Sequence, residues 1–186
     1  MFFNRHIKQG KEIGQNTLQM LTSATMATEF DDMGSFKPTK EFFTDPYVSG
    51  FITNFVGFSI VFGLGGGNWS TTKKGECIAE AFKEIDPYDQ LIQILTGKLK
   101  VDQEQNKAGL NDGATAVGVI FKKLKADDQD PKYLEAKSLA EDMQNFSRGG
   151  SIPMGTQHDS LSSAVIMVTL RDYIQNKWDD GTITEI

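Results

Sequence analysis

Residues 46–64 read PYVSGFITNFVGFSIVFGL and contain no charged side chain. The neutral window continues to Thr72, giving 27 residues without Asp, Glu, Lys, Arg or His in a chain whose charged residues make up 24% of the total. A segment this apolar is either the most buried helix of a soluble core or a membrane span. The choice between these two interpretations decides the fold class.

Placed on a helix at about 100° per residue, the neutral segment has three different sides. Aromatic residues line one side and aliphatic residues the next, while Ser49, Thr53 and Gly57 mark a third side of small or polar residues. Small residues four apart allow a neighbouring backbone to approach closely. Asn54 is costly at bilayer depth. We therefore predict a central core helix over residues 46–64, with a single-span membrane protein as the weaker alternative.

Three Asp-Pro pairs predict helix starts at Asp45-Pro46, Asp86-Pro87 and Asp130-Pro131. Aspartate is a favoured N-cap, and proline is favoured at the first helical position because its missing N–H would have no partner there. The spacings between the pairs are 41 and 44 residues, which is within the range of helical-hairpin repeats.

A glycine-containing loop and a second apolar helical pattern follow each of these starts. The expected loops contain Gly65 to Asn68, Gly109 to Gly113, and Gly149 to Gly155. The expected second helices cover about 71–85, a segment that carries Val117 to Lys125, and about 158–178. The pattern predicts three consecutive αα-hairpins, and an ordinary six-helix bundle with recurring caps is an equally good interpretation.

We therefore predict an all-α fold of six or seven helices in a single domain over residues 1–186. An N-terminal helix and a connector occupy residues 1–44, and the three hairpins occupy residues 45–186 around the central apolar helix.

The charge balance and the cysteine count limit the classes of function. The net charge is −6 and the pI is about 4.9, which argues against nucleic-acid binding because that needs clustered Lys and Arg. The single cysteine, Cys77, predicts a reducing, cytoplasmic setting, and no apolar signal segment follows Met1. Glu76, Glu80 and Glu84 lack the histidines of a di-iron motif, so we expect a solvated acidic face and no metal or cofactor.

The loop at residues 65–74 is the one candidate ligand site. Glycines, hydroxyls and lysines at a helix start can bind an anionic group such as phosphate. The chain has no Gly-Lys followed by Ser or Thr, as a P-loop requires, so helix capping explains the same residues more simply. The candidate residues are Gly66, Gly67, Trp69, Ser70, Thr71, Lys73, Lys74 and, from the loop of the third hairpin, Arg148.

The sequence contains no recognisable catalytic motif. We therefore expect a soluble helical protein–protein interaction or scaffold module, and the sequence does not decide whether the chain has enzymatic activity. The apolar run from Ala164 to Leu170 in the last helix predicts either deep packing or pairing with a second copy of the chain. The alternative function is a binder, or an enzyme, that holds a small anionic ligand at residues 65–74.

Overall fold

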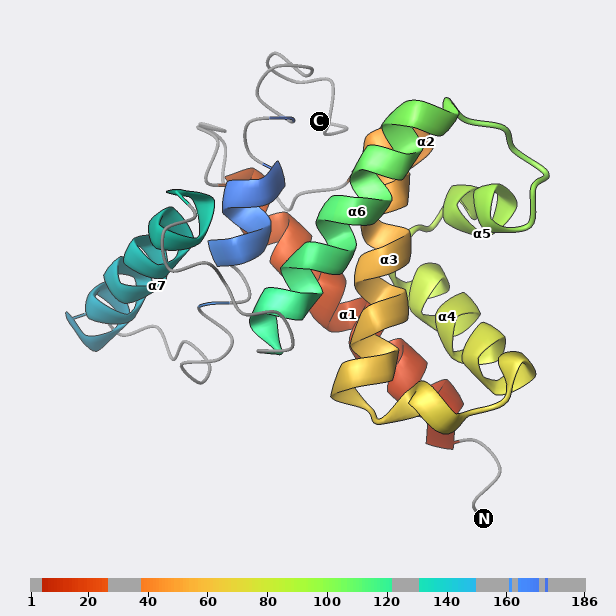
Figure 1. Ribbon diagram of the computed structural model, residues 1–186, viewed down its shortest axis with the longest axis horizontal. Helices are drawn as coiled ribbons and strands as arrows, with labels where there is room; N and C mark the ends of the chain where they lie inside the picture. The colour runs from red at the N-terminus through yellow and green to blue at the C-terminus, as the bar shows by residue number, and fades with distance from the viewer. Residues whose placement is uncertain are drawn as a thin grey trace.

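The computed structural model describes residues 5–26, 38–121, 131–149, 161, 164–170 and 173, with side chains for all of these except 22–26 and 143–149. This part of the chain forms seven α-helices, one 3-10 helix (η1) and a further helical segment at 164–170, so the all-α class is confirmed (Figure 1). The elements are α1 Arg5–Met26, α2 Lys40–Thr44, α3 Pro46–Gly63, η1 Gly66–Asn68, α4 Thr71–Ile85, α5 Gln90–Leu95, α6 Gln103–Ile120 and α7 Pro131–Gly149.

The central helix α3 begins where its Asp-Pro pair predicts. The Asp45 carboxylate accepts a hydrogen bond from the Val48 backbone N–H at 2.9 Å, and Pro46 opens the helix. The Tyr173 hydroxyl lies 3.1 and 3.0 Å from the two oxygens of the same carboxylate, to which it donates. The cap of the central helix therefore also fixes Tyr173, which comes from the C-terminal part of the chain.

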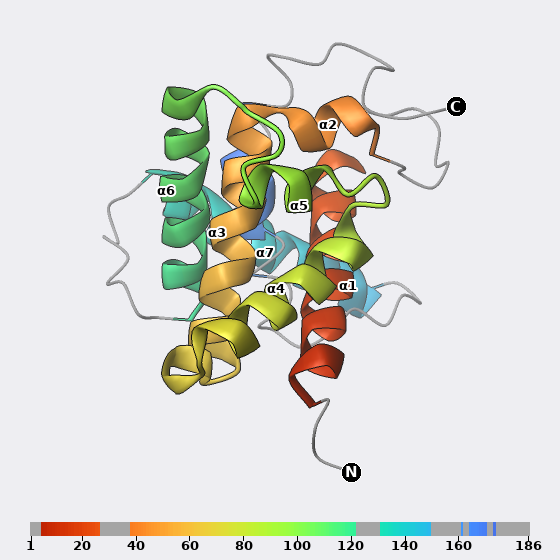
Figure 2. The same cartoon turned by 90° about the vertical axis from the view of Figure 1, so that its right-hand side faces the viewer.

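Glycines bring the backbones of α3 and α6 into contact. A Cβ added at Gly50, Gly109 or Gly113 would lie less than 3.0 Å from a carbonyl oxygen of the opposite helix, a separation that Cβ atoms do not adopt. Gly109 lies against Tyr47, and Gly113 lies against Phe51, one turn further along both helices. The two helices are therefore parallel, as Figure 2 shows.

Two asparagine side chains hold the same pair of helices together. The Asn54 amide donates to the Leu110 carbonyl at 2.8 Å, and the Asn106 amide donates to the Pro46 carbonyl at 3.0 Å. Gly50 and Asn54, on the small and polar side predicted for the central helix, thus face α6, and the half-buried Asn54 and Asn106 amides are hydrogen-bonded across the interface.

The helices α1 and α4 form a second pair of the same kind. A Cβ at Gly10 or Gly14 would lie less than 3.0 Å from the carbonyl oxygens of Cys77 and Ala81 respectively. The contacts again advance in the same direction along both helices, so α1 and α4 are also parallel.

Each of these helices therefore packs most extensively on a partner that is distant in sequence, α3 on α6 and α1 on α4 (Figure 2). An αα-hairpin instead pairs successive, antiparallel helices. The array of three consecutive hairpins is not confirmed, because two other α-helices and η1 separate the members of each parallel pair.

Two local predictions were wrong for identifiable reasons. Residues 109–113 lie inside α6, not in a loop, because their glycines serve close helix packing. Asp86 does not start a helix directly either. It is buried, it accepts hydrogen bonds from the N–H groups of Tyr88 and Leu91 at 2.8 Å each, and α5 begins only after Asp89, whose φ is 59°. Burial raises the pKa of the Asp86 carboxyl against the opposing effect of these hydrogen bonds.

Other expected helix boundaries differ from the observed ones by a few residues or lie partly outside the described residues. The connector expected before Asp45 contains α2, and the helix expected after Asp86 is the short α5, which ends at Leu95. The third Asp-Pro pair agrees with the start of α7 at Pro131, while Asp130 lies outside the described residues. Of the last predicted helix, residues 161, 164–170 and 173 are described, and all are helical.

The neutral segment is enclosed by other helices. Ten of the 18 residues of α3 are buried, including Phe51, Ile52 and Val56. By length and composition, α3 is also the one helix in the described residues that could cross a membrane. Its contacts with α1, α2, α4, α5, η1 and α6 match the core interpretation made from the sequence.

We predict that Gly50→Ala destabilises the protein by about 1–3 kcal/mol, because overpacking of a filled interface has a cost of this size. Gly57→Ala is the matched control in the same helix, since a Cβ there has no neighbour within 4 Å. It should stabilise by about 0.5–1 kcal/mol through helix propensity. Urea unfolding measures both values, and equal effects of the two substitutions would contradict the close contact between α3 and α6.

Candidate functional site

The loop at residues 65–74 acts as a connection between helices. Gly65 adopts a left-handed φ of 65°, Gly66 is buried at the start of η1, and the Trp69 N–H donates to the Gly66 carbonyl at 3.0 Å. The Ser70 hydroxyl accepts from the Lys73 N–H at 3.3 Å and caps α4, which begins at the next residue. These contacts are the ones that helix termination and capping require.

The two lysines of this loop contact its own atoms. Lys74 Nζ donates to the Gly67 carbonyl at 2.8 Å, and Lys73 Nζ lies 4.5 Å from the centroid of the Trp69 ring. The His6 ring, which is bonded through Nε2 to Glu76 at 2.7 Å, packs edge-on against the same indole. An anionic ligand would have to compete with these contacts for either ammonium group.

Arg148 does not join the other candidate residues in a loop. It lies in the last turn of α7, and its side chain is outside the described residues. Figure 1 shows α7 and α4 at opposite sides of the molecule, so the backbone of Arg148 is remote from Thr71, Lys73 and Lys74 at the start of α4.

The acidic residues of α4 remain accessible to solvent, and two of them also contact α1. Glu76 and Glu84 bond to His6 and Gln15 of α1, the latter at 3.0 Å, so this row follows the edge of the α1–α4 interface. Cys77 is buried in the same interface, and burial raises the pKa of its thiol to about 11, so the thiolate is scarce at neutral pH. Within the described residues, no group of three or more His, Cys, Asp or Glu could hold a metal ion.

A pocket of about 170 Å³ lies between α6, α7 and the helical segment 164–170. Four of its residues, at i, i+3, i+4 and i+7, share one face of α6. The sequence interpretation missed this face because residues 109–113 were expected to form a loop. The lining residues are Asp112, Thr115, Ala116, Val119, Lys132, Tyr133, Ala136, Val165 and Thr169.

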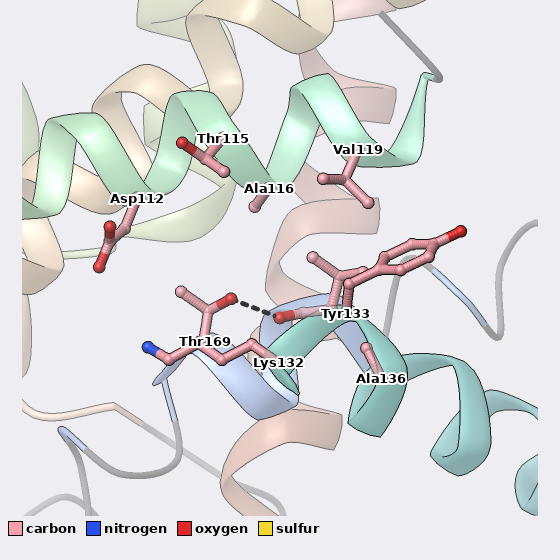
Figure 3. A pocket seen from close by; sticks show the side chains of 9 residues that line it. Asp112, Thr115, Ala116, Val119, Lys132, Tyr133, Ala136 and Thr169 are labelled. Carbon is pink, nitrogen blue, oxygen red and sulfur yellow. Dashed lines mark hydrogen bonds between the residues drawn. The ribbon is translucent and has the colours of Figure 1, made fainter. Parts of the chain in front are cut away.

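The pocket is polar at one end and apolar at the other. Figure 3 shows Asp112, Thr115, Lys132 and Thr169 gathered on one side, with Val119 and Ala136 toward the opposite side. The Thr115 hydroxyl donates to the Asn111 carbonyl at 2.9 Å, and the Thr169 hydroxyl donates to the Val165 carbonyl at 2.7 Å. Both threonines therefore use their only hydroxyl hydrogen within their own helix.

Asp112 is connected to the core through Tyr47 of α3. The Tyr47 hydroxyl donates to Asp112 Oδ2 at 2.6 Å, and the Tyr47 ring stacks on Tyr173 with 4.2 Å between the ring centroids. Burial, followed by the hydrogen bond to Asp112, raises the pKa of the Tyr47 phenol well above its usual range. Tyr47 is therefore a neutral hydrogen-bond donor at physiological pH, and it holds the carboxylate at the polar end of the pocket.

No family model, curated protein or solved structure matches this chain.

We predict that millimolar inorganic phosphate leaves Trp69 fluorescence unchanged, because Lys73 and Lys74 already contact loop atoms. A Trp178→Phe background removes the other tryptophan. In that background, Lys73→Met should alter the emission without any ligand, since it removes the cation over the indole. A saturable phosphate-induced shift that disappears in Lys74→Met would instead restore residues 65–74 as an anion site.

Proposed function

We propose that this chain is a helical protein–protein interaction module whose contact surface is formed by α7 and the adjoining pocket. The observation that carries the proposal is the position of Leu134. Its side chain is 49% exposed on α7, and it directly follows Lys132 and Tyr133, which both line the pocket.

The leucine alone would support little, because single exposed hydrophobic residues are ordinary on protein surfaces. Leu134 is more informative because it is exposed on the same helix, α7, whose Lys132, Tyr133 and Ala136 line a concave, partly apolar site. Partner proteins commonly bind by placing a few anchoring side chains in such pockets, and these anchors carry most of the binding energy.

The packing of α7 supports this orientation of the surface. Ala136 and Ala140 are buried on its inner side, while Lys137 and Glu141 are exposed. Leu134 is therefore an exposed large apolar residue on a helix that packs on the rest of the chain through Ala136, Leu139 and Ala140.

A partner of a different sequence is favoured over a second copy of this chain. The apolar residues of the last helix, from which pairing of two copies was predicted, are buried within the chain itself. These are Ala164, Val165, Ile166, Met167, Val168 and Leu170. The net charge of −6 favours a partner with basic groups and disfavours nucleic acid. The cytoplasm remains the proposed location, on the single cysteine.

We expect a photoreactive amino acid in place of Leu134 to form a discrete crosslinked adduct in the cells that make the protein. The same replacement at Leu95 is a matched control, because Leu95 is also 49% exposed but belongs to α5, away from the pocket. Mass spectrometry identifies the adduct, and the purified partner should lose affinity for Leu134→Glu but not for Leu95→Glu. Equal crosslinking from both positions, or none from position 134, would refute this surface.

A further inference from the structure

We infer that the pocket between α6, α7 and residues 164–170 binds an organic ammonium group attached to a short apolar chain or ring. This inference rests on the proposed function for the biological role of the site, and it adds the chemistry that the site would recognise. It follows from the hydrogen-bonding state of each polar group that lines the pocket.

The polar side chains other than Lys132 and Tyr133 can only accept hydrogen bonds from a ligand. A hydroxyl group has one hydrogen, and those of Thr115 and Thr169 are donated to the carbonyls of Asn111 and Val165. An ionised carboxylate has no hydrogen to donate. Tyr47 occupies Oδ2 of Asp112 and leaves Oδ1 for a ligand. Three acceptors at one end of a pocket are suited to an ammonium group, which has only donors.

The charge of Asp112 is oriented but not neutralised. Its partner Tyr47 is a neutral donor, and Asp112 takes part in none of the ion pairs found in the described part of the chain. A cationic ligand would therefore form a charge-assisted hydrogen bond with Asp112, which is stronger than a bond between neutral groups.

The remainder of the pocket suits a small apolar group. Aliphatic side chains of Ala116, Val119, Ala136 and Val165 line it. Its volume of about 170 Å³ is close to that of a cavity that holds benzene, at roughly 150 Å³. A four-carbon chain, as in n-butylammonium or a lysine side chain, fits this combination of an apolar end and an acceptor end.

Lys132 is the lining residue that would favour a negatively charged ligand. It lies at the polar end in Figure 3, and an anion could approach its ammonium group. Such an anion would also face Asp112 and two hydroxyl oxygens that have no hydrogen to offer. We therefore assign Lys132 to the rim, where its positive charge repels a cationic ligand and weakens its binding.

Isothermal titration calorimetry of the 186-residue chain with n-butylammonium tests this inference, with n-butanol as the neutral analogue and butyrate as the anionic one. We expect saturable binding of n-butylammonium alone, weakened roughly tenfold to a hundredfold by Asp112→Asn, as loss of a charged hydrogen bond predicts. Lys132→Gln should strengthen binding. Opposite effects of the two variants cannot both result from misfolding, and thermal unfolding checks each of them.

Preferential binding of butyrate, or no binding of n-butylammonium to either the wild type or Lys132→Gln, would overturn the inference. Neither result affects the crosslink from position 134, so failure of the ammonium site and failure of the interaction surface are distinguishable. When n-butylammonium binds, its effect on that crosslink assigns the natural source of the group. Competition indicates a lysine of the partner, and an unchanged yield indicates a free amine.

Discussion

Contact between the backbones of α3 and α6 is the constraint on which the rest of this structure depends. At Gly50, Gly109 and Gly113 there is no room for a Cβ, so the two helix axes approach as closely as their main chains permit. Close approach brings the Asn54 and Asn106 amides within reach of carbonyls on the opposite helix. Hydrogen bonds then fix the parallel register that the glycines allow. The α1–α4 pair repeats this arrangement with Gly10 and Gly14.

The register of α3 and α6 also determines where the pocket lies. It places the Tyr47 hydroxyl 2.6 Å from Asp112, which directly precedes Gly113, so that a core tyrosine holds a carboxylate at the surface. Tyr47 stacks on Tyr173, whose hydroxyl binds the Asp45 cap of α3. The central helix, its N-terminal cap and the pocket residue Asp112 are thus linked by direct contacts. A change in helix register would disturb all of them together.

The sequence predicted the elements whose causes are local. The Asp45 cap, the length of α3, the Ser70 cap and the bounds of α4 follow from residues that are close in the chain, and each agrees with the structure. Gly50 and Asn54 of the small and polar side predicted for the central helix do face α6. Residues 65–74 were also identified from local sequence. Their contacts within the loop favour helix capping over an anion-binding site.

What the sequence could not predict depends on partners that are distant in the chain. Glycine is as compatible with a loop as with a helix contact, and only the presence of α3 opposite Gly109 and Gly113 decides between them. The pocket combines Asp112, Lys132 and Thr169 from three separate segments, so no local spacing reveals it. The spacing of Asp112, Thr115, Ala116 and Val119 could have indicated the pocket face of α6. It does so only when residues 103–120 are recognised as one helix.

The most direct test of this arrangement is the pattern of nuclear Overhauser effects from glycine α-protons in protein labelled selectively at glycine. The parallel pairing predicts contacts from Gly109 to Tyr47 and from Gly113 to Phe51, both advancing in the same direction. An antiparallel pairing would reverse that order, and a consecutive-hairpin fold would replace these contacts with extensive contacts between α3 and α4. Either pattern would contradict the parallel α3–α6 contact and the pocket that depends on it.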